Sequence, residues 1–144
     1  MRTSGILLPI FSLPNSYGIG TLGKEAYDFV DFLEKCHQTY WQVLPIGPTS
    51  YGDSPYQSFS VFAGNPYFID FDLLKEEGLL EESDYAEYLD ESLSIDYGKI
   101  YNTRYLVLRR AYSKFDIKLL KNFEKENSDW LEDFSLFMTL KDYH

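Results

Sequence analysis

The fold is decided by one stretch, which reads Tyr40-Trp-Gln-Val-Leu-Pro-Ile-Gly-Pro-Thr-Ser-Tyr-Gly-Asp-Ser-Pro-Tyr-Gln-Ser-Phe-Ser-Val-Phe-Ala-Gly-Asn-Pro-Tyr-Phe68. Its first five residues are typical of a β-strand, which Pro45 ends. From Gly47 onward the stretch has no helical or alternating apolar period, and glycines and prolines interrupt it repeatedly. Residues 47–68 are therefore predicted to form a long, ordered loop. Such loops are uncommon in compact domains and are often functional.

This loop mixes aromatic rings with short hydrogen-bonding side chains. Flat apolar rings with polar groups between them would suit a ligand that has C–H faces and hydroxyl edges, such as a sugar. Packing of the rings against the protein body is the more common arrangement, so both interpretations stay open on composition alone. Asp53 could serve as a general acid or base, but an aspartate in a turn more often accepts hydrogen bonds from backbone N–H groups. Asn65, before Pro66, has the same turn interpretation.

Length, charge and cysteine content limit the classes of function. A chain of 144 residues favours one domain. The net charge of -10 argues against nucleic acid and anionic membrane surfaces as partners. The single cysteine, Cys36, cannot form an internal disulfide and indicates a reducing compartment; it is predicted to be a buried thiol on an apolar helix face. Two histidines and one cysteine cannot build an ordinary structural zinc site. No run is long enough to span a bilayer, and no cleavage site follows the apolar N-terminus, so a cytoplasmic protein is predicted.

The segment Gly18-Ile-Gly-Thr-Leu-Gly23 matches the G-x-G-x-x-G spacing of dinucleotide-binding loops. That interpretation requires a strand directly before the motif and an acidic residue about 20 positions after it. Leu13-Pro-Asn-Ser precedes the motif, and Tyr40-Trp-Gln-Val follows at the required distance. The pattern therefore favours loop geometry and a helix start over nucleotide binding.

Apolar spacing predicts helices on both sides of the loop. The first covers residues 24–36, with an apolar face made by Ala26, Phe29, Val30, Leu33 and Cys36. After the loop we expect a short extended piece at residues 67–71 and a helix from Ser83 to about Leu89. A long helix over residues 101–123 should bury the seam Tyr101, Tyr105, Leu108, Tyr112, Phe115 and Leu119 in the core, rather than use its tyrosines to bind a ligand. A last helix begins at Asn127 or Ser128 and carries Trp130, Phe134, Phe137 and Met138 on one face.

The order helix, strand and functional-looking loop is typical of an α/β barrel, in which the loops after the strands build the active site. Only one strand is evident, whereas a barrel needs about eight. The chain is therefore expected to be an N-terminal piece of a larger α/β protein. Residues 1–75 would form its first barrel segment, with the substrate-binding loop 47–68. Residues 76–144 would form a helical insertion and the helix that follows it.

Four segments resemble the 4-alpha-glucanotransferases of glycoside hydrolase family 77, the amylomaltases or disproportionating enzymes. They are Ser4-Gly-Ile-Leu-Leu-Pro, Tyr17-Gly-Ile-Gly, Tyr40-Trp-Gln-Val-Leu-Pro-Ile-Gly-Pro-Thr and the run from Tyr51 to Tyr67. Within that run, Gly-Asp-Ser-Pro-Tyr-Gln-Ser is the most specific match. The resemblance is close from Arg2 to about Leu80 and looser from there to His144.

The resemblance implies a TIM (β/α)8 barrel with helical insertions, incomplete in this chain. It implies an enzyme that transfers an α-1,4-glucan segment to the 4-hydroxyl of another glucan or of glucose with retention, acting on α-1,4-glucans, maltooligosaccharides and glucose. The two carboxylates that such chemistry needs would lie beyond His144, so no catalytic residue is assigned here, and no metal or cofactor is implied.

The resemblance also assigns three substrate-binding residues. Tyr56 would stack on the sugar beside the scissile bond, Ser54 would contribute a hydroxyl contact, and Tyr51 would belong to a secondary glucan site on the surface. The alternatives are a non-catalytic glucan-binding module that uses the same loop and a purely structural helical domain.

Overall fold

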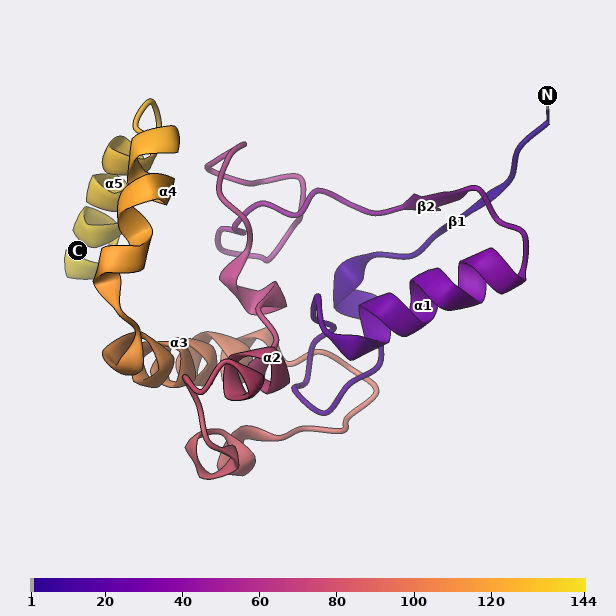
Figure 1. Ribbon diagram of the computed structural model, residues 1–144, viewed down its shortest axis with the longest axis horizontal. Helices are drawn as coiled ribbons and strands as arrows, with labels where there is room; N and C mark the ends of the chain where they lie inside the picture. Colours follow the sequence, from indigo (N-terminus) through magenta and orange to yellow (C-terminus); the bar gives the residue numbers. More distant parts are fainter. Residues whose placement is uncertain (1) are drawn as a thin grey trace.

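The computed structural model describes residues 2–144. A short parallel strand pair and its helix lie at one end of the molecule, and two short helices stand side by side at the other (Figure 1). The loop that follows the second strand runs between these two ends, and the longest helix crosses below it. The strands are β1 (Gly5–Leu7) and β2 (Tyr40–Gln42), and the helices are α1 (Lys24–Lys35), α2 (Phe71–Glu76), α3 (Tyr97–Lys114), α4 (Leu120–Glu126) and α5 (Leu131–Tyr143).

The two strands and α1 form a βαβ unit, the building block of α/β proteins. β1 and β2 pair in parallel, with Ile6 opposite Trp41. The Trp41 indole N–H donates to the Leu8 carbonyl at 2.7 Å, and the Trp41 ring meets Phe29 of α1 edge-on at 4.9 Å. The predicted strand is thus confirmed, and the structure mixes helix and strand as expected. Within residues 2–144, no helix has the length and apolarity needed to cross a bilayer.

The prediction for α1 is confirmed to within one residue, but the prediction for Cys36 is wrong. Ala26 and Leu33 are buried, whereas Cys36 is exposed. The helix ends before Cys36, and His37 adopts a left-handed conformation with φ of 54°. Cys36 therefore lies at the end of the helix, where its thiol is open to solvent.

The region after the loop is more helical than its sequence predicts. The expected extended piece at residues 67–71 is wrong, because a 3-10 turn covers Pro66–Phe68 and α2 begins at Phe71. Side-chain caps explain both elements: the Asn65 side chain accepts from the Tyr67 N–H at 3.0 Å, and Asp70 accepts from the Leu73 N–H at 3.1 Å. The helix expected from Ser83 to Leu89 is replaced by two 3-10 turns, Glu82–Asp84 and Ala86–Tyr88.

The predicted long helix is split, and its most buried face lies beside the predicted seam: Tyr105 and Leu108 of that seam still pack partly buried against the core, but its other members do not. α3 begins after Asp96, which accepts from the Lys99 N–H at 3.0 Å, and it ends before Phe115, whose backbone is extended. The buried positions of α3 are Ile100, Arg104, Val107 and Ala111. Each lies one residue before a member of the predicted seam, and one residue turns a helix face by about 100°. Tyr101 and Tyr112 are consequently 66% and 59% exposed.

Two apolar clusters form the core, and α3 contributes to both. One contains Ile100 with Ile10, Leu13, Ile19, Ala26, Tyr67 and Phe68. The other contains Val107 and Ala111 with Tyr17, Phe71, Leu80 and Tyr85. Arg104 lies on α3 between the residues that enter these two clusters.

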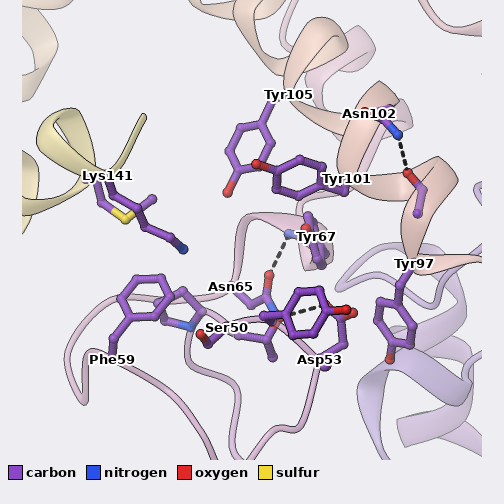
Figure 2. Close-up of a pocket in the computed structure, with 16 residues that line it drawn as sticks. Ser50, Asp53, Phe59, Asn65, Tyr67, Tyr97, Tyr101, Asn102, Tyr105 and Lys141 are labelled. Atoms are coloured by element: carbon purple, nitrogen blue, oxygen red, sulfur yellow. Dashed lines mark hydrogen bonds between the residues drawn. The ribbon is translucent and has the colours of Figure 1, made fainter. Parts of the chain in front are cut away.

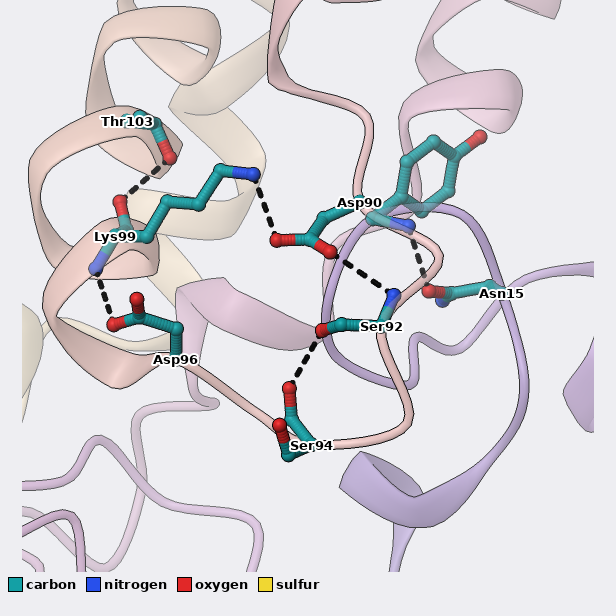
Figure 3. A network of polar contacts seen from close by, with 8 residues as sticks. Asn15, Asp90, Ser92, Ser94, Asp96, Lys99 and Thr103 are labelled. Atoms are coloured by element: carbon teal, nitrogen blue, oxygen red, sulfur yellow. Dashed lines mark hydrogen bonds and ion pairs between the residues drawn. The ribbon is translucent and has the colours of Figure 1, made fainter.

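A polar network joins the N-terminal loop to the start of α3 (Figure 3). The Asp90 carboxylate pairs with the Lys99 ammonium at 2.7 Å and accepts from the Ser92 N–H at 3.0 Å. The Asp90 backbone also exchanges hydrogen bonds with Ser16 and Gly18 at 2.7 and 3.0 Å. These contacts fix the register of α3 against the first part of the chain.

Candidate functional site

The loop at residues 47–68 is irregular and ordered, as predicted. Its two ends are joined, because the Asn65 N–H donates to the Ile46 carbonyl at 2.8 Å. Gly47 is required at the near end, since a Cβ there would lie 2.4 Å from the Ser58 hydroxyl oxygen. Further along, the Ser60 hydroxyl oxygen accepts from the N–H groups of Phe62 and Ala63 at 3.2 and 3.1 Å. The loop is therefore held by its own hydrogen bonds rather than by regular secondary structure.

Two tight turns present tyrosines at the surface of this loop. In the first, the Asp53 N–H donates to the Ser50 carbonyl at 3.0 Å, and Gly52 has φ of 91°, which a glycine adopts readily. Tyr51, at the tip of this turn, is 100% exposed. In the second, the Gln57 N–H donates to the Ser54 carbonyl at 3.0 Å, and Tyr56 is 73% exposed.

A cavity of about 710 Å³ lies between this loop, α3 and α5. Figure 2 shows the tyrosines of α3 along one side, Phe59 and Lys141 on another, and the loop residues below. Tyr97, Tyr101 and Tyr105 of α3 line the cavity together with Tyr51 and Tyr67. The volume and the mixture of aromatic rings and polar side chains in the lining are those of a small-molecule site.

Ring orientation and polar groups define the chemistry of the cavity. Tyr67 and Tyr105 meet edge-on with centroids 6.2 Å apart. The Lys141 ammonium lies 4.5 Å from the centroid of Phe59. Burial, assisted by Tyr105 and Asp53, raises the pKa of Tyr67 to about 12. Burial and Asp53 also raise the pKa of Tyr97. These phenols consequently stay neutral at physiological pH and offer hydroxyls that both donate and accept.

Aromatic contacts hold the loop against α5. Phe59 lies 5.4 Å from Phe137 and 6.3 Å from Phe134, and Phe62 stacks on Trp130 at 5.7 Å, all between ring centroids. The face predicted for the last helix is thus real, although α5 begins three residues after Ser128. One cavity wall depends on this contact, because Phe59 and Lys141 both line the cavity.

The structure divides the predicted site residues between two places. Tyr51 lies at the cavity, whereas Tyr56 and Ser54 lie in the second turn, outside the cavity lining. Asp53 lines the cavity with φ of 53°, and its carboxylate accepts from the Thr49 hydroxyl at 3.4 Å instead of from the backbone N–H groups expected of it. Sequence analysis missed the contribution of α3. The tyrosine seam of α3 is the signal for this contribution, although its period equally predicts core packing.

Comparison with known proteins gives a consistent result. A family model described as 4-alpha-glucanotransferase, glycoside hydrolase family 77, matches residues 8–144. The chain is 57% identical over 137 residues to a 4-alpha-glucanotransferase of Clostridium butyricum, covering 92% of this chain and 28% of the relative. It is 51% identical over 148 residues to one of Streptococcus pneumoniae, covering 99% of this chain and 29% of the relative.

Among solved structures, it resembles an amylomaltase from Streptococcus agalactiae in complex with acarbose. The TM-score is 0.93 at 44% identity, over 99% of this chain and 30% of that one. The chain therefore spans less than a third of the length of the relatives it matches.

Proposed function

This chain belongs to the 4-alpha-glucanotransferase family, glycoside hydrolase family 77, and we propose that it is the substrate-binding part of such an enzyme. The proposed reaction transfers an α-1,4-glucan segment to the 4-hydroxyl of an acceptor glucan or glucose, with retention of configuration. Retention requires a carboxylate nucleophile and a second carboxyl group as acid and base, which we assign to sequence outside this chain. The observation that carries the proposal is the match of the family model to residues 8–144, and the tyrosine-lined cavity beside the loop that follows β2 supports it by offering a place for a sugar.

The fold proposed for the whole enzyme is a TIM barrel, of which residues 1–75 are the first segment and residues 76–144 a helical insertion with its following helix. β1, α1 and β2 have the alternation and parallel pairing that a barrel requires. The substrate-binding loop follows the carboxyl end of β2, which is the side where barrel enzymes build their active sites. A single cysteine is in keeping with the reducing cytoplasm as the place of action.

We assign two glucan contacts to the loop. Tyr56 stacks on the sugar beside the scissile bond, with the Ser54 hydroxyl as a neighbouring polar contact. The exposure of the Tyr56 ring supports this role, because a ring face that no neighbouring side chain covers can stack on a pyranose. Tyr51 belongs to a separate glucan site at the cavity, together with Tyr101 across it. Neutral phenols and ring faces in one cavity suit the alternating C–H and hydroxyl surfaces of an α-1,4-glucan.

The substrates proposed are α-1,4-glucans, maltooligosaccharides and glucose. The test is disproportionation of maltotriose by the full-length enzyme, with products separated by chromatography. We expect glucose together with longer maltooligosaccharides of unchanged anomeric configuration. Hydrolysis to glucose and maltose without longer products would refute the transferase assignment. The family match favours a transferase over a non-catalytic glucan-binding module.

A second measurement concerns the cavity alone. Tyr101→Ala should weaken the binding of maltoheptaose to the full-length enzyme in calorimetry, because it removes a ring that lines the cavity. Unchanged affinity would show that the cavity is not a glucan site, while leaving the transferase reaction itself untouched.

A further inference from the structure

The guanidinium of Arg104 is buried in the middle of α3, and only part of its hydrogen-bonding capacity is satisfied. Arg104 is 2% exposed, although arginine is almost never fully buried without a partner. One terminal nitrogen, Nη2, donates to the Ile69 carbonyl. Within residues 2–144, Nε and Nη1 have no hydrogen-bond partner. Such a group is costly to retain, so its presence calls for a reason other than stability.

The surroundings of the guanidinium stabilise its charge only in part. Its central carbon lies 4.0 Å from the ring centroid of Phe71 and 5.9 Å from that of Tyr17. Burial lowers its pKa to about 10, with Asp70 acting in the opposite direction. The side chain is therefore still a cation at neutral pH, and its one directed contact is the bond to Ile69.

That bond joins two walls of the tyrosine-lined cavity. Arg104 immediately precedes Tyr105 and lies one turn beyond Tyr101, both of which line the cavity from α3. Ile69 lies two residues after Tyr67, which lines the cavity from the opposite segment with Asn65. Apolar packing also connects these walls, since Ile100 and Tyr67 share one core cluster. Apolar packing has no directional preference, whereas a guanidinium–carbonyl bond sets the position of one wall along the other.

We propose that Arg104 is a positioning residue, which holds the tyrosines of α3 at a fixed height above Tyr67 so that the cavity can accept a glucan. The proposal rests on the function proposed above for this cavity. The side chain does not touch the ligand, because it lies behind the wall and is absent from the cavity lining. Arg104 sets the distance between the tyrosine rings of α3 and Tyr67, and this distance decides whether successive sugars can stack on them.

The same helix provides a matched control. Arg110 also donates from its guanidinium to a backbone carbonyl, that of Asp84, and its central carbon lies 5.6 Å from the Tyr88 ring centroid. These contacts face the 3-10 turns at residues 82–88 and are remote from the cavity lining. Arg110→Met therefore removes a guanidinium–carbonyl bond from α3, together with an ion pair to Glu87 at 3.6 Å, without touching the link between the cavity walls.

The experiment compares Arg104→Met, Arg104→Lys and Arg110→Met in the full-length enzyme. Three quantities are measured: the melting temperature, the dissociation constant for maltoheptaose, and ligand-free hydrogen exchange of the backbone N–H groups within residues 65–69, where Pro66 has none. Methionine fills much of the volume without a charge, so Arg104→Met should melt within about 3 °C of the parent, because apolar replacement of a buried ion is often neutral. It should nevertheless bind maltoheptaose about tenfold more weakly and exchange the 65–69 amides about tenfold faster, as expected when a bond to a charged donor is lost.

Lysine keeps the charge and can still donate to the Ile69 carbonyl. Arg104→Lys should therefore stay within about threefold of the parent in both affinity and exchange, because it loses the stacking on Phe71 but keeps a charged donor for the carbonyl. Arg110→Met should match the parent in both. A purely structural role would instead lower the melting temperature and the affinity of both Arg104 variants together.

Several results would overturn the proposal. Arg104→Met with parental affinity and parental exchange would do so, and so would equal losses in Arg104→Met and Arg110→Met. If Arg104→Met does not fold, Arg104→Lys decides alone, and loss of affinity in a well-folded lysine variant refutes the positioning role. If the parent itself binds no maltoheptaose, the glucan site is refuted, while the exchange rates still decide whether Arg104 holds the two walls together.

Discussion

Replacing Tyr56 with alanine should separate function from stability in the full-length enzyme. Tyr56 is 73% exposed, so folding buries only about a quarter of a tyrosine's roughly 200 Å². At about 25 cal/mol per Å², that burial contributes about 1 kcal/mol. Loss of a stacked ring at the centre of a binding site typically costs about 2 kcal/mol, which corresponds to about a 30-fold fall in kcat/KM. The functional loss should therefore be about twice the loss of stability.

The assay is maltotriose disproportionation, with urea unfolding measured on the same preparations. Tyr112→Ala is the matched control, because Tyr112 is 59% exposed on α3 and lies outside the cavity lining. It removes a ring of similar exposure and should change kcat/KM less than about twofold, as for a surface site without ligand contacts. Equal kinetic losses in the two variants, or a loss in Tyr56→Ala that follows its fall in stability, would refute the stacking role.

Three further predictions concern the chain and its electrostatics. The isolated 144-residue chain should show no disproportionation of maltotriose; measurable transfer would contradict the assignment of the catalytic carboxylates to sequence outside it. The isolated chain should also melt without a cooperative transition and bind the dye ANS, because Leu7, Tyr40 and Ile46 are exposed beside unpaired strand edges; a sharp monomeric transition at high temperature would argue against this. Finally, the Lys99 ammonium and the Ser92 N–H hold the pKa of Asp90 at about 2, below its ordinary value. The contribution of the ionised Asp90 carboxylate to the free energy of unfolding should be complete above about pH 4, and it should vanish as the pH falls through the folded pKa. Asp90→Asn should therefore lower the melting temperature at neutral pH but not near pH 2. A constant difference in melting temperature across this range would contradict the assignment.

Patterns within a few neighbouring residues were enough to predict α1, β2 and the irregular loop. The apolar period found α1, and the aromatic and β-branched run found β2. Glycines and prolines marked the irregular loop. The cap at Asp70 was equally local, but it was overlooked because the apolar residues before it favoured an extended piece. β1 has no clear signal of its own, since a strand of three residues is defined by its pairing with β2, where Ile6 lies opposite Trp41, rather than by its own sequence.

The cavity was harder to predict, because it depends on which face of α3 turns inward. The aromatic seam indicates one face of α3, whereas the face one residue before it contains Arg104, a residue type that is almost never fully buried without a partner. In the structure the face with Arg104 is the most buried, so Tyr101 and Tyr105 line the cavity, and only Tyr105 also packs against the core. An arginine at a core position thus conceals the buried face from sequence analysis and leaves the aromatic face at the cavity. A buried charge within an otherwise regular apolar period is accordingly a reason to examine the neighbouring aromatic face as a binding surface before assigning it to the core.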